Sequence, residues 1–131
     1  MANGGMTDGA FNSFIKGLLR RGSARWKPRY EVLNDAKRGK RINKATGRMA
    51  EHYECASCHQ LFPLRSVEVD HIVPIMYDGI TWDEVINRMF CDIEGLQVLC
   101  KDCHKYKTQL ERKLNDIGRI KTEDNSDKKK R

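Results

Sequence analysis

Cys55-Ala-Ser-Cys58 and Cys100-Lys-Asp-Cys103 are the two stretches that decide the fold of this chain. In each stretch two residues separate the cysteines, a spacing that lets a short turn present two thiolates to one ion. Four thiolates complete a closed tetrahedral Zn²⁺ site, which leaves no open position for a substrate. The sequence therefore predicts a structural zinc that ties together the ends of a 41-residue intervening segment.

The other cysteine and a neighbouring histidine qualify this prediction. Cys91 has no partner in the scheme and is interpreted as a small buried hydrophobic residue. His59 directly follows Cys58 and is an alternative ligand in place of one thiolate. No apolar run is long enough to span a bilayer, and the Gly-rich start lacks the features of a signal peptide. We therefore expect an intracellular protein, without a membrane partner, whose thiols stay reduced.

Strands and helices are expected around the two cysteine pairs. Alternating or apolar runs predict strands, and apolar residues at helical spacing predict helices. A Thr81-x-x-Glu84 capping box marks one helix start, and Gly118 marks one helix stop. The expected elements are helices at 10–21, about 28–38, 81 to about 90 and about 102–115, and strands at 67–71 and 96–100.

Charge is distributed unevenly along the 131 residues, whose net charge is +7. Residues 11–48 hold twelve Lys or Arg against two acidic residues, whereas residues 49–118 hold seven against twelve. A basic segment suits a polyanion such as DNA, and an acidic one suits a divalent cation. We therefore expect a flexible lead and basic helical arm at 1–48, a separate domain at 49–118, and a charged disordered tail at 119–131.

Three motifs lie inside and beside the cysteine pairs. They are Val69-Asp70-His71-Ile72-Val73-Pro74, Glu94-Gly95-Leu96-Gln97-Val98-Leu99-Cys100 and Cys103-His104-Lys105-Tyr106-Lys107-Thr108. In this order, and framed by the cysteines, they resemble the HNH endonuclease family over about residues 53–110. The segment before the second motif also resembles HNH proteins encoded beside phage packaging genes.

The resemblance implies an α+β fold with a ββα-metal core and a metal-dependent endonuclease that cleaves DNA. We expect little sequence specificity, because the sequence contains no clear base-reading element. It implies that Asp70 and His104 bind a catalytic Mg²⁺, Mn²⁺ or other divalent ion, and that His71 activates water. An unperturbed imidazole titrates near neutral pH, which suits a general base. Phage terminase or other packaging proteins are implied as further partners. The alternative is a zinc-stabilised DNA-binding or packaging-accessory protein without catalysis.

Gly95 departs from the family pattern, because HNH proteins normally carry Asn before Leu-Gln. In the family that Asn braces the loop that carries the catalytic histidine. Asn87, Asp92 or backbone groups are the candidates to replace it. The substitution bears on efficiency more than on mechanism.

Basic side chains complete the predicted DNA site. Arg25, Lys27 and Arg29 lie in the arm, and Lys105 and Lys107 flank His104 at a helix start, which suits phosphate. For Lys105 a solvated helix face is an equal alternative. For Trp26 and Tyr30 we prefer packing of the arm against its domain, with aromatic contacts to nucleic acid as the alternative. We expect Tyr106 and Leu110 in the core and His52 at the surface.

Overall fold

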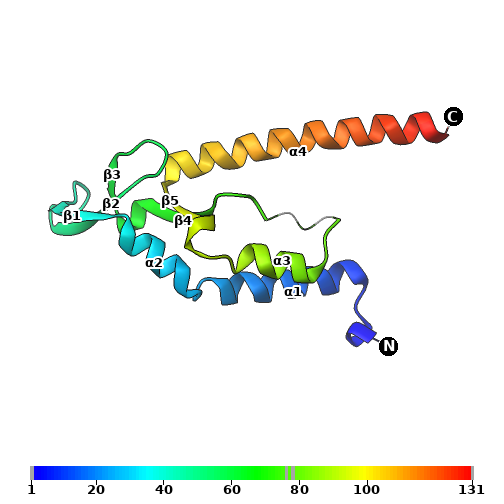
Figure 1. The fold of residues 1–131 in the computed structure, drawn as a ribbon, viewed down its shortest axis with the longest axis horizontal. Coiled ribbons are helices and arrows are strands. Elements are labelled where there is room, and N and C mark those ends of the chain that lie inside the picture. The colour runs from blue at the N-terminus through cyan, green and yellow to red at the C-terminus, as the bar shows by residue number, and fades with distance from the viewer. Residues whose placement is uncertain (1, 76, 78, 131) are drawn as a thin grey trace. The chain divides into compact units, whose positions relative to one another are not determined.

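Two small antiparallel sheets and four α-helices make up the part of the chain that the computed structural model describes, residues 2–75, 77 and 79–130. For residues 2, 115 and 117–130 it describes the backbone alone. The fold is thus α+β, as the sequence predicts. Figure 1 shows the order of the elements. The helices are α1 (Asp8–Ser23), α2 (Lys27–Asp35), α3 (Trp82–Met89) and α4 (Lys101–Lys130), and the strands are β1 (Lys37–Ile42), β2 (Met49–Glu54), β3 (Leu61–Pro63), β4 (Val67–His71) and β5 (Leu96–Cys100).

The chain divides into two compact units, each built from two separate stretches. The first unit comprises residues 1–37 and 69–98, and the second comprises residues 38–68 and 99–131. Strands β4 and β5 pair with each other, and short 3-10 helices, η2 (Leu64–Ser66) and η3 (Ile93–Gly95), precede them. The predicted domain boundaries at 48 and 118 stay predictions.

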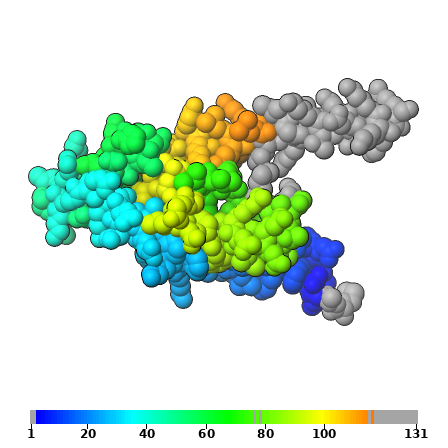
Figure 2. Space-filling view, viewed as in Figure 1, coloured from blue at the N-terminus to red at the C-terminus, as the bar shows by residue number. Residues whose placement is uncertain are grey.

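In the first unit, α1 packs against α3, and α2 packs against η3 (Figures 1 and 2). The α3 helix begins as the capping box predicts, since the Thr81 hydroxyl accepts a hydrogen bond from the Glu84 amide at 3.2 Å. Val85 and Met89 lie one turn apart on α3 and are each 2% exposed. They form the unit's core with Leu96 and Val98 of β5. This spacing explains why α3 buries one face.

In the second unit, the strands follow the order β1-β2-β3. Strand β2 pairs antiparallel with β3, with Tyr53 opposite Phe62. Burial concentrates at one end of this sheet, where Cys55, Leu99 and Cys100 form a cluster, with Phe62 and Cys103 packed against it. The core of this unit is therefore small and built largely of the cysteine residues themselves.

The sequence analysis predicted no strand between the helix ending near residue 38 and Cys55, but the structure has two there, β1 and β2. Residues Lys37–Ile42 form β1, and a turn over residues 43–48 joins it to β2. The turn is closed by hydrogen bonds from the Asn43 amide to the Arg48 carbonyl (2.8 Å) and from the Gly47 amide to the Asn43 carbonyl (2.7 Å). Gly47 has a φ of 73°, which favours glycine. Because every residue of β1 is exposed, the strand has no apolar alternation to predict it from.

Helix ends also differ from the prediction. The α2 helix ends at Asp35 rather than near residue 38, because β1 begins at Lys37. The α4 helix continues past the predicted stop at Gly118, as far as Lys130. The side chains of residues 117–131 lie outside the described set, so the predicted disordered tail at 119–131 stays a prediction.

Candidate metal and phosphodiester site

The local structure around the two cysteine pairs explains how they meet. Cys55 follows β2, and its amide donates to the Gln60 carbonyl at 3.0 Å, which closes a tight turn around Cys58. His59 occupies the left-handed region at φ 61° within that turn. Cys100 ends β5, and Cys103 lies in the first turn of α4, where its amide donates to the Cys100 sulfur at 3.4 Å. Two turns thus present two thiols each.

The four sulfur atoms of Cys55, Cys58, Cys100 and Cys103 lie within 4.8 Å of one another. The sulfurs of Cys58 and Cys100 are 4.0 Å apart. Four thiolates at about 2.3 Å from a central Zn²⁺ would be separated by roughly 3.8 Å, whereas a disulfide needs about 2.05 Å. The cysteines are free thiols at a spacing that could hold a metal ion, and an all-sulfur donor set is consistent with structural zinc.

The thiols influence one another's ionisation. At Cys55, burial opposes ionisation, but backbone amides of Cys100, Cys58 and Ser57 donate to its sulfur and lower its pKa to about 6. At Cys100, burial and the neighbouring sulfurs of Cys103 and Cys55 raise the pKa to about 12. The Cys55 thiol therefore ionises readily, and its negative charge opposes ionisation of the Cys100 thiol. A bound dication would relieve this crowding of negative charge.

His59, the alternative ligand, does not join this cluster. Its Nδ1 lies 3.6 Å from a carboxylate oxygen of Glu54, and its side chain is 71% exposed. Within the described residues, the metal-compatible group of His, Cys, Asp and Glu side chains consists of the four cysteines. Cys91 also lies outside it, and burial raises the pKa of this thiol above its usual value.

His71 and Asp70 end β4 in the first unit, and each has a specific partner. The Nε2 of His71 donates to the Met89 carbonyl at 2.8 Å, at the end of α3. Asp70 accepts a hydrogen bond from the Gln97 side chain of β5 at 3.1 Å. Gln97 belongs to the second sequence motif, but the sequence analysis assigned it no role. Both predicted site residues are half-buried and are oriented by neighbouring elements of their own unit.

His104 lies in the first turn of α4, in the second unit. Its Nδ1 donates to a carboxylate oxygen of Glu68 at 2.9 Å, and the side chains are 35% and 44% exposed. Sequence reasoning missed Glu68. A signal was present, because Glu68 stands two residues before Asp70 and strand alternation turns both to the same face of β4. A carboxylate that accepts a hydrogen bond from one ring N–H fixes the tautomer of the imidazole.

Gly95 stands where backbone groups brace the end of β4. Its carbonyl accepts the Ile72 amide at 3.0 Å, and its amide donates to the Asp92 carbonyl at 3.0 Å. The contacts of residue 95 in this region are therefore made by its backbone groups. A Cβ atom at position 95 would lie 2.8 Å from the Cys91 sulfur and 3.2 Å from its Cβ. The space needed by a side chain is thus taken by Cys91.

We expect Gly95→Ala to destabilise the protein by about 1–3 kcal/mol, because the added methyl group overpacks against Cys91. Cys91→Ala should relieve the clash, so the double variant should be more stable than the sum of the single effects. Urea unfolding of the four proteins measures this coupling. If the effects of Gly95→Ala and Cys91→Ala on the free energy of unfolding simply add, the contact between the two positions is contradicted.

The predicted DNA-binding residues vary in their surroundings. Arg25 is exposed, Arg29 is half-buried, and the Lys27 ammonium is 3.7 Å from Glu31 with its side chain 86% exposed. Lys105 is exposed, whereas Lys107 lies 2.7 Å from Glu111 at the following turn of α4. Lys107 is thus engaged in an ion pair, which makes it the less available phosphate contact.

Several residues expected to serve structure are placed differently. Trp26 packs as predicted, edge-on against Phe90 at 5.4 Å, and its indole donates to the Cys91 carbonyl at 2.7 Å. Tyr30 is 57% exposed, so its predicted packing role was wrong. Tyr106 and Leu110 were expected in the core and are 64% and 42% exposed, because α4 turns that face outward.

His52 was expected at the surface and is buried instead. It is 7% exposed, and its Nδ1 contacts the Ala50 carbonyl at 2.8 Å. His52 and its neighbour Tyr53 are both buried, so burial in β2 does not alternate, and a buried polar residue is not visible from apolar patterning.

Comparisons of this chain with protein families, curated proteins and solved structures found no match. Its function therefore has to be argued from its own residues. Among the described residues, no helix combines the length and the apolar character needed to cross a bilayer.

Proposed function

We propose that this protein is a metal-dependent endonuclease that hydrolyses phosphodiester bonds in DNA, with β4, β5 and α4 as a ββα-metal core of the HNH type. The observation that carries the proposal is the hydrogen bond from the His71 Nε2 to the Met89 carbonyl at 2.8 Å. The bond fixes the tautomer and the orientation of the ring, as a general base requires. The bond supports a chemical role for the ring.

The tautomer determines what His71 can do. Because the carbonyl accepts, Nε2 carries the proton, and the neutral ring then holds its lone pair on Nδ1. A lone pair on a ring nitrogen suits a general base that takes a proton from water. In this proposal His71 activates the nucleophile, and the Met89 carbonyl keeps the ring oriented while it does so.

Asp70 and His104 are the proposed ligands of a catalytic Mg²⁺, Mn²⁺ or other divalent ion. Such an ion supplies positive charge that stabilises the developing charge on the phosphate and on the leaving 3′-oxygen. The Gln97 side chain donates a hydrogen bond to one Asp70 oxygen. Glu68 accepts a hydrogen bond from the Nδ1–H of His104, which leaves Nε2 as the proposed coordinating nitrogen. A carboxylate and an imidazole are suitable ligands for such ions.

We propose Zn²⁺ as the ion of the four cysteines, because closed all-thiolate sites are typical of structural zinc. Its part is to hold the end of β5 and the start of α4, which carries His104, against the turn after β2. The zinc takes no part in the reaction. It stabilises the unit from which one catalytic ligand projects.

DNA is the proposed substrate because of the charge of residues 11–48, among them Arg25, Lys27 and Arg29. Phosphate contacts position a protein on DNA, whereas sequence is read by contacts to the bases. Low sequence specificity is proposed because no motif in the sequence is typical of base reading. The link to phage packaging rests on the family resemblance alone.

The experiment that tests this function is a divalent-ion titration of plasmid nicking. His104→Ala is expected to raise the ion concentration for half-maximal nicking more than tenfold, since it removes a ligand, and Glu68→Ala about tenfold, since outer partners tune affinity less directly. His59→Ala is the matched control, because that ring is 71% exposed and outside both sites. Nicking that needs no added ion, or an unchanged requirement in His104→Ala, would refute the proposed ligand.

A further inference from the structure

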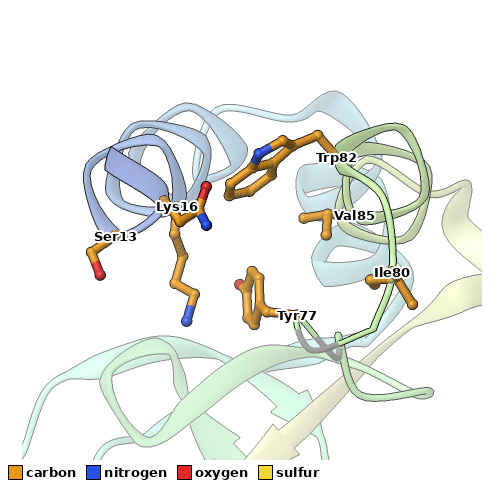
Figure 3. Close-up of a pocket in the computed structure, with 7 residues that line it drawn as sticks. Ser13, Lys16, Tyr77, Ile80, Trp82 and Val85 are labelled. Carbon is orange, nitrogen blue, oxygen red and sulfur yellow. The ribbon is translucent and has the colours of Figure 1, made fainter. Parts of the chain in front are cut away.

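A small pocket in the first unit carries chemistry that the proposed reaction does not use. It has a volume of about 190 Å³ and lies between the middle of α1 and the segment that leads into α3 (Figure 3). The residues that line it are Asn12, Ser13, Lys16, Tyr77, Ile80, Trp82 and Val85.

Two cations of α1 gather on one aromatic ring of this pocket. The Lys16 ammonium lies 3.9 Å from the centre of the Tyr77 ring. Arg20, one turn further along α1, donates from Nε to the Tyr77 hydroxyl at 3.3 Å, and its guanidinium carbon is 5.5 Å from the ring centre. Positive charge is therefore held at the pocket by cation–π contacts and a hydrogen bond.

The pocket is apolar at its inner end and polar at its rim. Val85, 2% exposed, forms the innermost part, and the rings of Trp82 and Tyr77 are half-buried walls. Asn12 and Ser13 are exposed at the rim, and Figure 3 shows Ser13 at the outer edge. The volume of about 190 Å³ is below the roughly 300–1,000 Å³ of pockets for drug-sized ligands and suits a single flat ring system.

A nucleotide offers the groups that match this lining. Its base has two flat faces for aromatic stacking and a polar edge for an amide or a hydroxyl, and its phosphate attracts cations. Lys16 and Arg20 belong to the basic segment 11–48, in which twelve Lys or Arg stand against two acidic residues. A contact that only joined α1 to the loop would be expected to be apolar, whereas these side chains are polar or charged at the mouth.

We propose that this pocket accepts one unpaired base of a DNA strand, stacked on Trp82, with Lys16 and Arg20 contacting the neighbouring phosphate. This inference rests on DNA as the ligand of the proposed function and adds the form of DNA that binds best. A base inside a duplex is stacked and paired and cannot enter a concave pocket of this size. Bulged, mismatched or single-stranded positions are therefore preferred.

The test measures binding by the full-length His71→Ala protein, in which the DNA probes stay intact. Three duplexes are compared by fluorescence anisotropy: one with a single bulged thymidine, one with an abasic residue in the bulge, and one fully paired. The bulged thymidine is expected to bind about tenfold tighter than the abasic bulge, as stacking of one base implies. Trp82→Leu should bring that ratio close to one. Lys16→Met should weaken binding of both bulged probes more than of the paired duplex, because both bulges keep the phosphate that Lys16 contacts.

Arg21→Met is the matched control, since it removes one charge from an exposed position of the same helix outside the pocket. It should lower affinity for all three probes alike and keep the ratio. If Trp82→Leu does not fold, Lys16→Met decides, because its side chain lies at the pocket wall and its loss should weaken binding of the bulged probes more than of the paired duplex. Thermal melting identifies such a variant.

Equal affinity for the thymidine and abasic bulges would show that the pocket does not bind a base. A Lys16→Met protein that loses no more affinity for the bulged probes than for the paired duplex would contradict the phosphate contact. Binding of free thymidine monophosphate without a bulge preference would overturn the proposal as well. These outcomes are distinct from failure of the nuclease, because no cleavage is measured. If the protein prefers the bulge but never nicks plasmid, the result would support base binding by the pocket and contradict the proposed endonuclease activity.

Discussion

Removal of the metal by a strong chelator is expected to unfold the second unit. The core there is small, and its most buried cluster is Cys55, Leu99 and Cys100, with Phe62 and Cys103 beside it. Zinc binding by small domains contributes about 10 kcal/mol or more to folding, whereas whole domains are stable by roughly 5–15 kcal/mol. Loss of the ion should therefore abolish the cooperative melting of this unit, as followed by circular dichroism.

Purified protein should contain one zinc per chain, as measured by elemental analysis. Cys55→Ser removes a ligand that is fully buried and should lose both zinc and folding. Cys91→Ser is the matched control, since Cys91 lies outside the four-sulfur cluster and should retain the ion. A folded protein without bound metal, in which all thiols react freely, would show that the cluster is not a metal site.

His71→Ala is expected to lower the rate of DNA cleavage by about a hundredfold to ten-thousandfold, as loss of a general base does. Single-turnover cleavage of a labelled duplex measures the rate. Zinc content, the melting temperature and DNA affinity should stay near those of the wild type, since the ring contacts a backbone carbonyl rather than the buried core. Added divalent ion should not restore the rate, in contrast to His104→Ala.

His59→Ala is the proper histidine control for this measurement, with a rate close to that of the wild type. His52 is unsuitable, because it is 7% exposed and its replacement would disturb β2. Cleavage by His71→Ala at the wild-type rate, in a preparation free of contaminating nuclease, would mean that His71 is not the base.

The elements nearest the cysteines could be predicted because each has a local cause. Spacing predicted the cysteine cluster, alternation and apolar runs predicted β4 and β5, and the Thr81–Glu84 capping box predicted the start of α3. Strand β1 could not be predicted from such signals. Its six residues are all exposed, and its pairing depends on the turn at Asn43 and Gly47.

The partners of the candidate catalytic residues could not be predicted from the sequence, because these contacts form only in the folded protein. The Met89 carbonyl is a backbone group at the end of a helix, and no side-chain motif marks it. The contact between His104 and Glu68 joins residues 36 positions apart in the sequence. The role of Gly95 likewise depends on Cys91, whose sulfur occupies the space that an Asn side chain would need.

Conversion of supercoiled plasmid by zinc-loaded, full-length protein tests the central proposal most directly. The proposal predicts that Mg²⁺ or Mn²⁺ induces nicked and then linear DNA, that omission of the ion prevents both, and that the products end in 3′-hydroxyl and 5′-phosphate groups. Plasmid that stays supercoiled under excess protein and ion, while DNA binding persists, would contradict an endonuclease and favour a zinc-stabilised DNA-binding protein.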